Sequence, residues 1–175
     1  TLIYFTAKRL FNSEFLSIAA AFLILVDGLH LVHSRTALLD IFLMFFIQVA
    51  VLAIIDGKYW LAGIALGLAS GTKWSGLYFT IALAIFVLIV DWLRRRESEN
   101  RIKDFLKEDL PTRFTEFGLI PIFTYILTWS GWFLTNTGWD RKYSHNIIKS
   151  FWHYHAEILN FHASLTEKHP YMANP

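Results

Sequence analysis

The sequence has no cysteine in its 175 residues, which excludes disulfide bridges and thiolate metal sites. It has little net charge: 16 Lys and Arg against 14 Asp and Glu give +2 with neutral histidines. This excess is too small to indicate a nucleic-acid partner. In contrast, 55% of the residues are hydrophobic and 17% are aromatic, more apolar surface than an ordinary soluble domain of this size can bury. The composition therefore favours a membrane protein.

The chain contains several apolar stretches whose lengths can be compared with the thickness of a bilayer. About 20 helical residues, at about 1.5 Å each, cross the roughly 30 Å hydrocarbon core. We therefore predict an all-α polytopic membrane protein with about five transmembrane helices, part of a sixth and an external interfacial helix. Residues 27–35 are expected to form a loop, and Pro121 to lie in the first turns of the last span. The apolar stretches are 1–7, 15–26, 36–55, 59–72, 74–92 and 117–134.

The distribution of basic residues predicts the orientation of these spans. Ten of the 16 Lys and Arg fall on one side of the predicted membrane, seven of them between residues 93 and 116. Loops rich in Lys and Arg stay in the cytoplasm, so 93–116 is predicted to be cytoplasmic and 135–175 external, in the cell membrane. The corresponding regions are a membrane domain over 1–95, a charged loop over 96–116, and a second membrane region with its external loop over 117–175.

Three charged residues lie at the predicted outer ends of spans. Arg35 and Asp40 stand at the head of "HSRTALLDIF", and Lys73 at the corner between two spans. Arg35 could be an anchor whose long side chain reaches the headgroups. Asp40 could accept a hydrogen bond from Thr36 or form a salt bridge with a basic residue of another span. Alternatively, Arg35 and Lys73 could hold an anion such as a lipid phosphate, with Asp40 supporting them.

Two further patterns concern packing and the C-terminal region. Gly63, Gly67 and Gly71 recur every four residues, so another helix is expected to approach closely along that stripe. In a helix over residues 147–165, the apolar side chains would gather on one broad face. This pattern predicts a helix lying in the membrane interface. The spacing of the five histidines in this region fits no usual zinc motif, and we predict neither metal nor cofactor. These histidines are His145, His153, His155, His162 and His169.

Three longer motifs resemble a known family. "SRTALLDIFLMFF", "WLAGIALGLASGTKWSGLYF" and "FWHYHAEILNFHASLTEKHPYMANP" are together similar to the protein O-mannosyltransferases, in particular to their actinobacterial-type branch, within the GT-C glycosyltransferases. The likeness covers nearly the whole chain in the same order. It implies a GT-C-like helical bundle in which residues 117–175 begin a C-terminal four-helix membrane region.

The resemblance implies an inverting transfer of mannose from a polyprenyl (dolichyl) phosphate mannose to Ser or Thr hydroxyls of secreted polypeptides, at the outer membrane face. The partners would be this lipid donor, the polypeptide acceptor, membrane lipids and the translocation machinery. Arg35 and Lys73 would bind the donor phosphate, with Asp40 and Trp74 in support. The family's catalytic acidic pair is expected upstream of Thr1, so the piece alone is expected to be inactive. Candidates for the acceptor channel are His155, Glu157 and His162.

Two other functions agree with parts of the sequence. A transporter or channel segment with a charged outer vestibule would explain several spans, an intramembrane Asp40 and a small-residue stripe. Against it, the polar residues concentrate at span ends, whereas transporters place them near the middle of the bilayer. A purely structural membrane anchor would leave Asp40 and Lys73 without a role.

Overall fold

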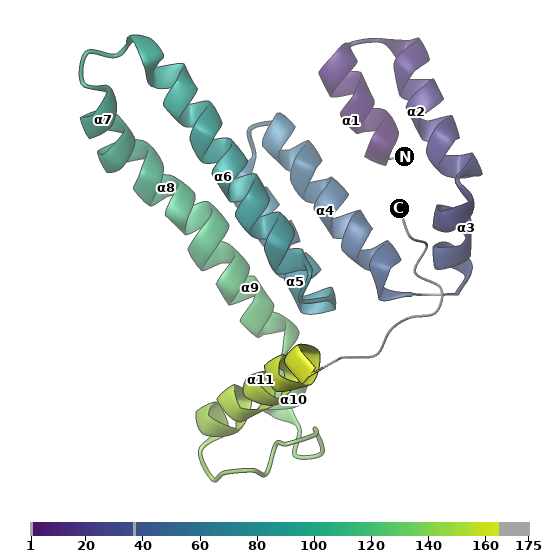
Figure 1. Ribbon diagram of the computed structural model, residues 1–175, viewed down its shortest axis with the longest axis vertical. Helices are drawn as coiled ribbons and strands as arrows, with labels where there is room; N and C mark the ends of the chain where they lie inside the picture. Colours follow the sequence, from purple (N-terminus) through teal and green to yellow (C-terminus); the bar gives the residue numbers. More distant parts are fainter. Residues whose placement is uncertain (1, 37, 165–175) are drawn as a thin grey trace. The chain divides into compact units, whose positions relative to one another are not determined.

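The computed structural model describes residues 2–36 and 38–164, and this part of the chain is helical, without a β-strand. The chain divides into two compact units, Thr1–Thr128 and Trp129–Pro175, and Figure 1 labels the helices of each. The predicted all-α class is confirmed. The longer helices of the first unit are α1 (Leu2–Phe11), α2 (Glu14–Val26), α3 (Gly28–Arg35), α4 (Leu39–Ile55), α5 (Tyr59–Thr72) and α6 (Gly76–Arg94).

Only part of the predicted set of spans has the length and composition of a membrane-crossing helix. Among the described residues, one helix, Gly76–Glu97, is long and apolar enough by itself, and α4 is apolar but shorter. A second candidate is the pair α2 and α3, bent by 59°. The loop predicted at 27–35 is wrong, because Gly28–Arg35 is helical. Asp27 caps this helix by accepting a hydrogen bond from the His30 N–H at 2.6 Å, and such caps favour a new helix start.

Helix α5 lies at the centre of the first unit, in contact with α4, α6 and α9. Figure 1 shows α4, α5 and α6 side by side. The buried core of this unit is built mainly from small side chains, which lets the helix backbones approach one another. It consists of Ala50, Ala53, Ala62, Ala65, Leu66, Val87 and Phe117.

The glycine stripe of α5 packs directly against the helix that ends the first unit. A Cβ added at Gly63 would lie 2.0 Å from the backbone oxygen of Glu116. At Gly67 it would lie 2.5 Å from the Cβ of Thr124, and Gly71 is similarly close to the next turn of the same helix. No side chain fits in such gaps. The predicted close helix approach along this stripe is confirmed.

Residues 101–128 form one uninterrupted helical segment, although the sequence predicted a charged loop up to residue 116. The segment contains two π-helical turns, η2 and η3, and each is followed two residues later by a proline, Pro111 or Pro121. Proline has no N–H and crowds the preceding turn, and a π turn is a common way to absorb such a disturbance inside a helix. Pro121 is therefore in the middle of a helix and not in its first turns. The parts are α7 (Arg101–Asp104), η2 (Phe105–Asp109), α8 (Leu110–Phe114), η3 (Thr115–Leu119) and α9 (Ile120–Thr128).

Ion pairs fasten this segment to the end of α6. Arg113 donates from Nε to the buried carboxylate of Asp91 at 2.6 Å and from Nη1 to Glu116 at 2.6 Å. Its guanidinium lies 3.7 Å from the ring centre of Tyr59. Partial burial acts to lower the pKa of Arg113, but the two carboxylates that accept its hydrogen bonds outweigh burial and raise it. The charged segment is thus held in place by partners on other helices.

The second unit packs α11 (Ile147–Ser164) against α10 (Ser130–Leu134) and the loop after it. Edge-to-face and tilted aromatic contacts make up much of this packing, a favourable arrangement for large rings. Ser150, fully buried, also fastens the loop by accepting from the Ser144 N–H at 3.0 Å. The predicted helix at 147–165 is confirmed as α11 up to Ser164, and residue 165 lies outside the described residues. The rings in contact are Trp129, Trp132, Phe133, Trp139, Phe151 and Tyr154.

Candidate functional site

Two of the predicted site residues meet at one end of the first unit. Lys73 donates from Nζ to Oδ1 of Asp40 at 2.8 Å. Asp40 lies in the first turn of α4, and Lys73 directly follows α5. Both side chains remain partly exposed, at 38% and 46%. Of the partners considered for Asp40, the structure thus favours the basic residue of another helix; the hydroxyl of Thr36 donates instead to the Val32 carbonyl at 2.8 Å.

A tight corner between α5 and α6 positions Lys73. Its backbone is extended, and its carbonyl accepts from the Gly76 N–H at 2.8 Å. Gly76 sits so close to α5 that an added Cβ would lie 2.6 Å from the carbonyl carbon of Ala69. Only glycine allows this close approach, so "GTKWSG" directs Lys73 towards α4.

Trp74 takes part in the same corner. Its indole Nε1 donates to the phenolic oxygen of Tyr125 at 3.1 Å, and Tyr125 belongs to α9. A buried or half-buried indole N–H needs such an acceptor. The predicted supporting role of Trp74 thus has a concrete contact, which ties the corner to α9. Tyr125 was not singled out from the sequence, because its partner is 51 residues away.

Arg35 is the last residue of α3 and is exposed. In the described part of the chain, Asp40 pairs with Lys73 and forms no ion pair with Arg35. The structure therefore brings together Asp40 and Lys73, and it leaves the participation of Arg35 a prediction. An exposed arginine at the end of a helix can reach either headgroups or a bound anion.

The acceptor-channel candidates all lie on α11 in the second unit. The Nδ1 atoms of His155 and His162 each lie 2.8 Å from the carbonyl four residues earlier, Phe151 and Ile158. Both contacts join neighbouring turns of α11 itself. Glu157 is exposed, with Oε1 3.9 Å from Nε2 of His153. Their role at an acceptor remains a prediction.

The second unit also contains a polar cluster that sequence reasoning missed. Asp140 Oδ2 lies 2.5 Å from Nδ1 of His153, and the His153 ring stacks on Tyr143 at 3.6 Å between ring centres. Asp140 lies in an irregular loop with φ 59°, so no periodicity relates it to α11. Within the described ranges, no three His, Cys, Asp or Glu side chains are placed to share a metal ion.

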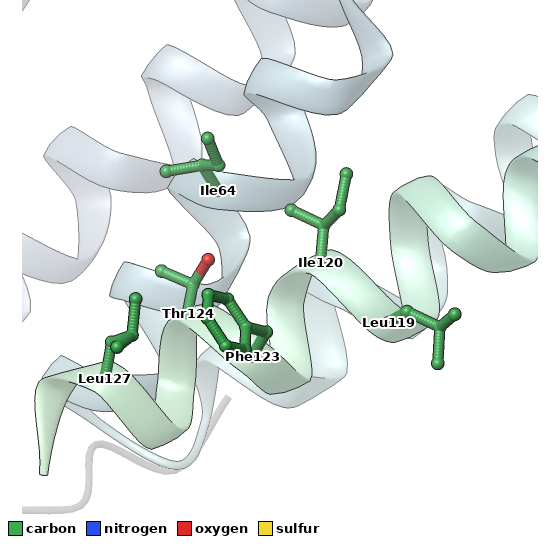
Figure 2. Close-up of a pocket in the computed structure, with 6 residues that line it drawn as sticks. All are labelled: Ile64, Leu119, Ile120, Phe123, Thr124 and Leu127. Carbon is green, nitrogen blue, oxygen red and sulfur yellow. The ribbon is translucent and has the colours of Figure 1, made fainter.

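An apolar groove of about 460 Å³ lies between α5 and the η3–α9 segment (Figure 2). The hydroxyl of Thr124 is the single polar side-chain group among the six lining residues that Figure 2 draws. The groove therefore has no charged side chain among these residues that could bind a phosphate or activate a hydroxyl, and it is not the candidate site. Its lining residues are Ile64, Leu119, Ile120, Phe123, Thr124 and Leu127.

The described residues are helical, with a lysine–aspartate pair at a helix corner, and comparison with known proteins shows the family of the chain. Residues 1–162 match the family described as dolichyl-phosphate-mannose-protein mannosyltransferase, and the chain belongs to this family. The resemblance expected from the three motifs is confirmed. No solved structure matches the chain at a significant level.

Three similar curated proteins carry the name polyprenol-phosphate-mannose–protein mannosyltransferase. The protein of Mycolicibacterium smegmatis is 30% identical, with 97% of this chain and 42% of the relative covered. That of Corynebacterium glutamicum is 32% identical, with 97% and 42% covered. That of Mycobacterium tuberculosis is 30% identical, with 96% and 41% covered. The chain thus spans about two fifths of the length of these relatives.

Proposed function

We propose that the protein containing this chain transfers mannose from a polyprenyl phosphate mannose to Ser or Thr hydroxyls of polypeptides. The observation that carries the proposal is the family match over residues 1–162. The names of relatives at 30 to 32% identity, which state a polyprenol-phosphate-mannose donor and a protein acceptor, support the same chemistry. A transferase family also gives no support to the transporter or channel alternative.

The donor phosphate is proposed to bind at the end of the first unit that carries Lys73 and Arg35. A phosphate leaving group gains negative charge as the glycosidic bond breaks, and cationic groups placed there stabilise that charge. Lys73 supplies a point charge, whereas Arg35 could bind two phosphate oxygens at once. Asp40 holds Lys73 at 2.8 Å, and Trp74 ties the same corner to Tyr125. Both contacts support a pre-positioned cation.

The surroundings of this reaction are part of the proposal. A donor with a prenyl tail requires a site in a membrane, and we propose a multi-pass protein of the cell membrane, with residues 93–116 cytoplasmic and 135–175 external. The transfer would then take place at the outer face, with inversion at the anomeric carbon, on polypeptides leaving the translocation machinery. The uneven distribution of Lys and Arg supports this orientation.

The proposal can be tested by mannose transfer in membranes that contain the full-length protein. The donor is a radiolabelled polyprenyl phosphate mannose, and the acceptor is a Ser/Thr-rich peptide. Loss of a charge-assisted phosphate contact in Arg35→Ala should cost about 2 to 4 kcal/mol, or roughly 30- to 1,000-fold in rate. Arg35→Lys should restore only part of it if the contact is bidentate. No transfer by the wild type would reject the function, whereas normal turnover of Arg35→Ala would reject only the phosphate role.

A further inference from the structure

The most unusual polar cluster of the second unit surrounds His153. Asp140 contacts its Nδ1 at 2.5 Å, and Tyr143 stacks on its ring at an interplanar angle of 11°. Asp140 is largely buried and adopts φ 59°, a backbone conformation that non-glycine residues rarely adopt. The imidazole is therefore fixed in position and in orientation by two neighbours from the loop.

This arrangement leaves the other ring nitrogen facing a carboxylate. Nε2 of His153 lies 3.9 Å from Oε1 of Glu157, too far for a direct hydrogen bond. An oxygen placed about 2.8 Å from both atoms would lie within normal hydrogen-bond distance of each. A hydroxyl suits both protonation states of His153, because it can donate to Nε2 or Glu157 and accept from a protonated ring. Both side chains are partly exposed, at 32% and 46%, so a ligand can reach them.

A purely structural role does not account for the cluster. The loop is already fastened to α11 by the buried Ser150, which accepts from the Ser144 N–H and lies 3.3 Å from the Ser144 carbonyl. Aromatic contacts such as Trp139 with Tyr154 add to this attachment. Glu157 contributes nothing to it, since its carboxylate is on the exposed side of α11.

We propose that His153 and Glu157 form a hydroxyl-binding subsite, positioned by Asp140 and Tyr143, which binds a Ser or Thr side chain of the acceptor polypeptide. The assignment to an acceptor rests on the proposed mannosyl transfer. A sugar hydroxyl of the donor has the same chemistry, and the two sources differ in which substrate loses affinity when the subsite is removed. Neither residue is given a part in the chemical step.

The test uses the purified full-length protein in detergent and two fluorescent peptides, one with Thr at the acceptor position and one with Val. Valine has the shape of threonine without the hydroxyl, so the ratio of the two Kd values isolates that group. The variants are Glu157→Gln, which is exposed and nearly isosteric, and His153→Phe, which keeps a ring against Tyr143. Asn160→Ala, exposed on the same helix, is the matched control. Thermal unfolding checks that each variant is folded.

The wild type and Asn160→Ala should bind the Thr peptide about tenfold more tightly than the Val peptide, as expected for a hydrogen bond to a charged group. In Glu157→Gln and His153→Phe this preference should fall about threefold, because each variant keeps one of the two hydrogen-bonding side chains. In mannose-transfer assays the same variants should raise the acceptor KM about threefold, with the donor KM unchanged. A preserved Thr preference, or a rise in donor KM instead, overturns the acceptor subsite. A wild type that prefers the Thr peptide but transfers no mannose would reject the proposed function and leave the hydroxyl subsite standing.

Discussion

Lys73 and Asp40, 33 residues apart in the sequence, form an ion pair at 2.8 Å that joins the α5–α6 corner to the first turn of α4. The pair is partly exposed, and exposed ion pairs contribute about 1 kcal/mol or less to stability. Its main consequence is therefore the position of the lysine. A cation held near a helix corner can meet an anion without first losing the conformational freedom of its long side chain.

We accordingly expect Lys73→Ala to separate activity from stability. Mannosyl transfer should fall about 10- to 100-fold, because one positive charge is lost beside the developing phosphate. The free energy of unfolding should change by about 1 kcal/mol or less. Transfer rates and thermal unfolding of the full-length protein measure the two effects. Lys58→Ala, an exposed lysine at the opposite end of α5, should leave both unchanged. A rate loss that merely follows a loss of folded protein would contradict the prediction.

The glycine stripe allows a sharp test of packing. Gly63→Ala places a methyl group where the backbone oxygen of Glu116 would be 2.0 Å away, so α5 and η3 must separate. Overpacking of this kind costs about 1 to 3 kcal/mol, and the melting temperature should fall. Gly131→Ala is the control, because an added Cβ there has no atom within 4 Å. Equal melting temperatures for the two variants would show that the close approach is absent.

The buried carboxylate of Asp91 makes Arg113 important for folding. Removing the arginine leaves Asp91, only 6% exposed, without its main partner, and an uncompensated buried charge costs several kcal/mol. Because Arg113 is not fully buried, we expect Arg113→Met to lower the free energy of unfolding by about 2 to 4 kcal/mol. The double variant Arg113→Met, Asp91→Asn should recover part of this loss. Urea unfolding of the purified protein measures both, with Arg96→Ala, an exposed arginine, as control.

Where apolar patterning is long and uninterrupted, the sequence predicts the helices closely. The predicted stretch 59–72 coincides with α5, and 74–92 lies within two residues of α6. The stripe of Gly63 and its neighbours was also recognisable, because four-residue spacing marks one face of a helix. These features depend on local periodicity alone.

Charged and irregular segments were harder to predict. Residues 101–116 are helical because Arg95 pairs with Asp109 and Glu108, and Arg113 with Asp91, contacts between segments that no local pattern reveals. A salt bridge from Asp40 to another span was one of several alternatives that the sequence left open. It forms with Lys73 because the corner containing Gly76 places Lys73 near Asp40. The Asp140–His153 contact joins an irregular loop to α11, so residue spacing could not indicate it.

The orientation of the chain can be tested by labelling. These 175 residues contain no cysteine, so a single thiol introduced among them gives an unambiguous signal once any cysteine elsewhere in the full-length protein is replaced. We expect Asn160→Cys to react with a membrane-impermeant maleimide on intact cells, and Glu99→Cys to react only after the membrane is permeabilised, because the dense Lys/Arg segment resists translocation. Both positions are exposed in the structure. The reverse labelling pattern would invert the proposed topology and place the Lys73 end in the cytoplasm.

The remaining prediction concerns the outward face of α11. Ile148, Trp152 and Leu159 are exposed at 61%, 68% and 60%, and helical geometry places all three on one side. Lys149 borders this stripe, as is common in helices that lie on a membrane surface. We expect a peptide of residues 147–164 to bind anionic liposomes, with a blue shift of the fluorescence of Trp152, its only tryptophan.

Leu159→Asp should weaken this binding about tenfold or more, because the peptide loses one buried leucine and gains a charge in the interface. Asn160→Asp adds the same charge one residue further on without removing apolar surface, so it should weaken binding much less. Titration of each peptide with liposomes, followed by the emission of Trp152, gives the two partition coefficients. If Leu159→Asp and Asn160→Asp bind equally, charge repulsion alone explains the loss, and the exposed stripe of α11 does not enter the membrane.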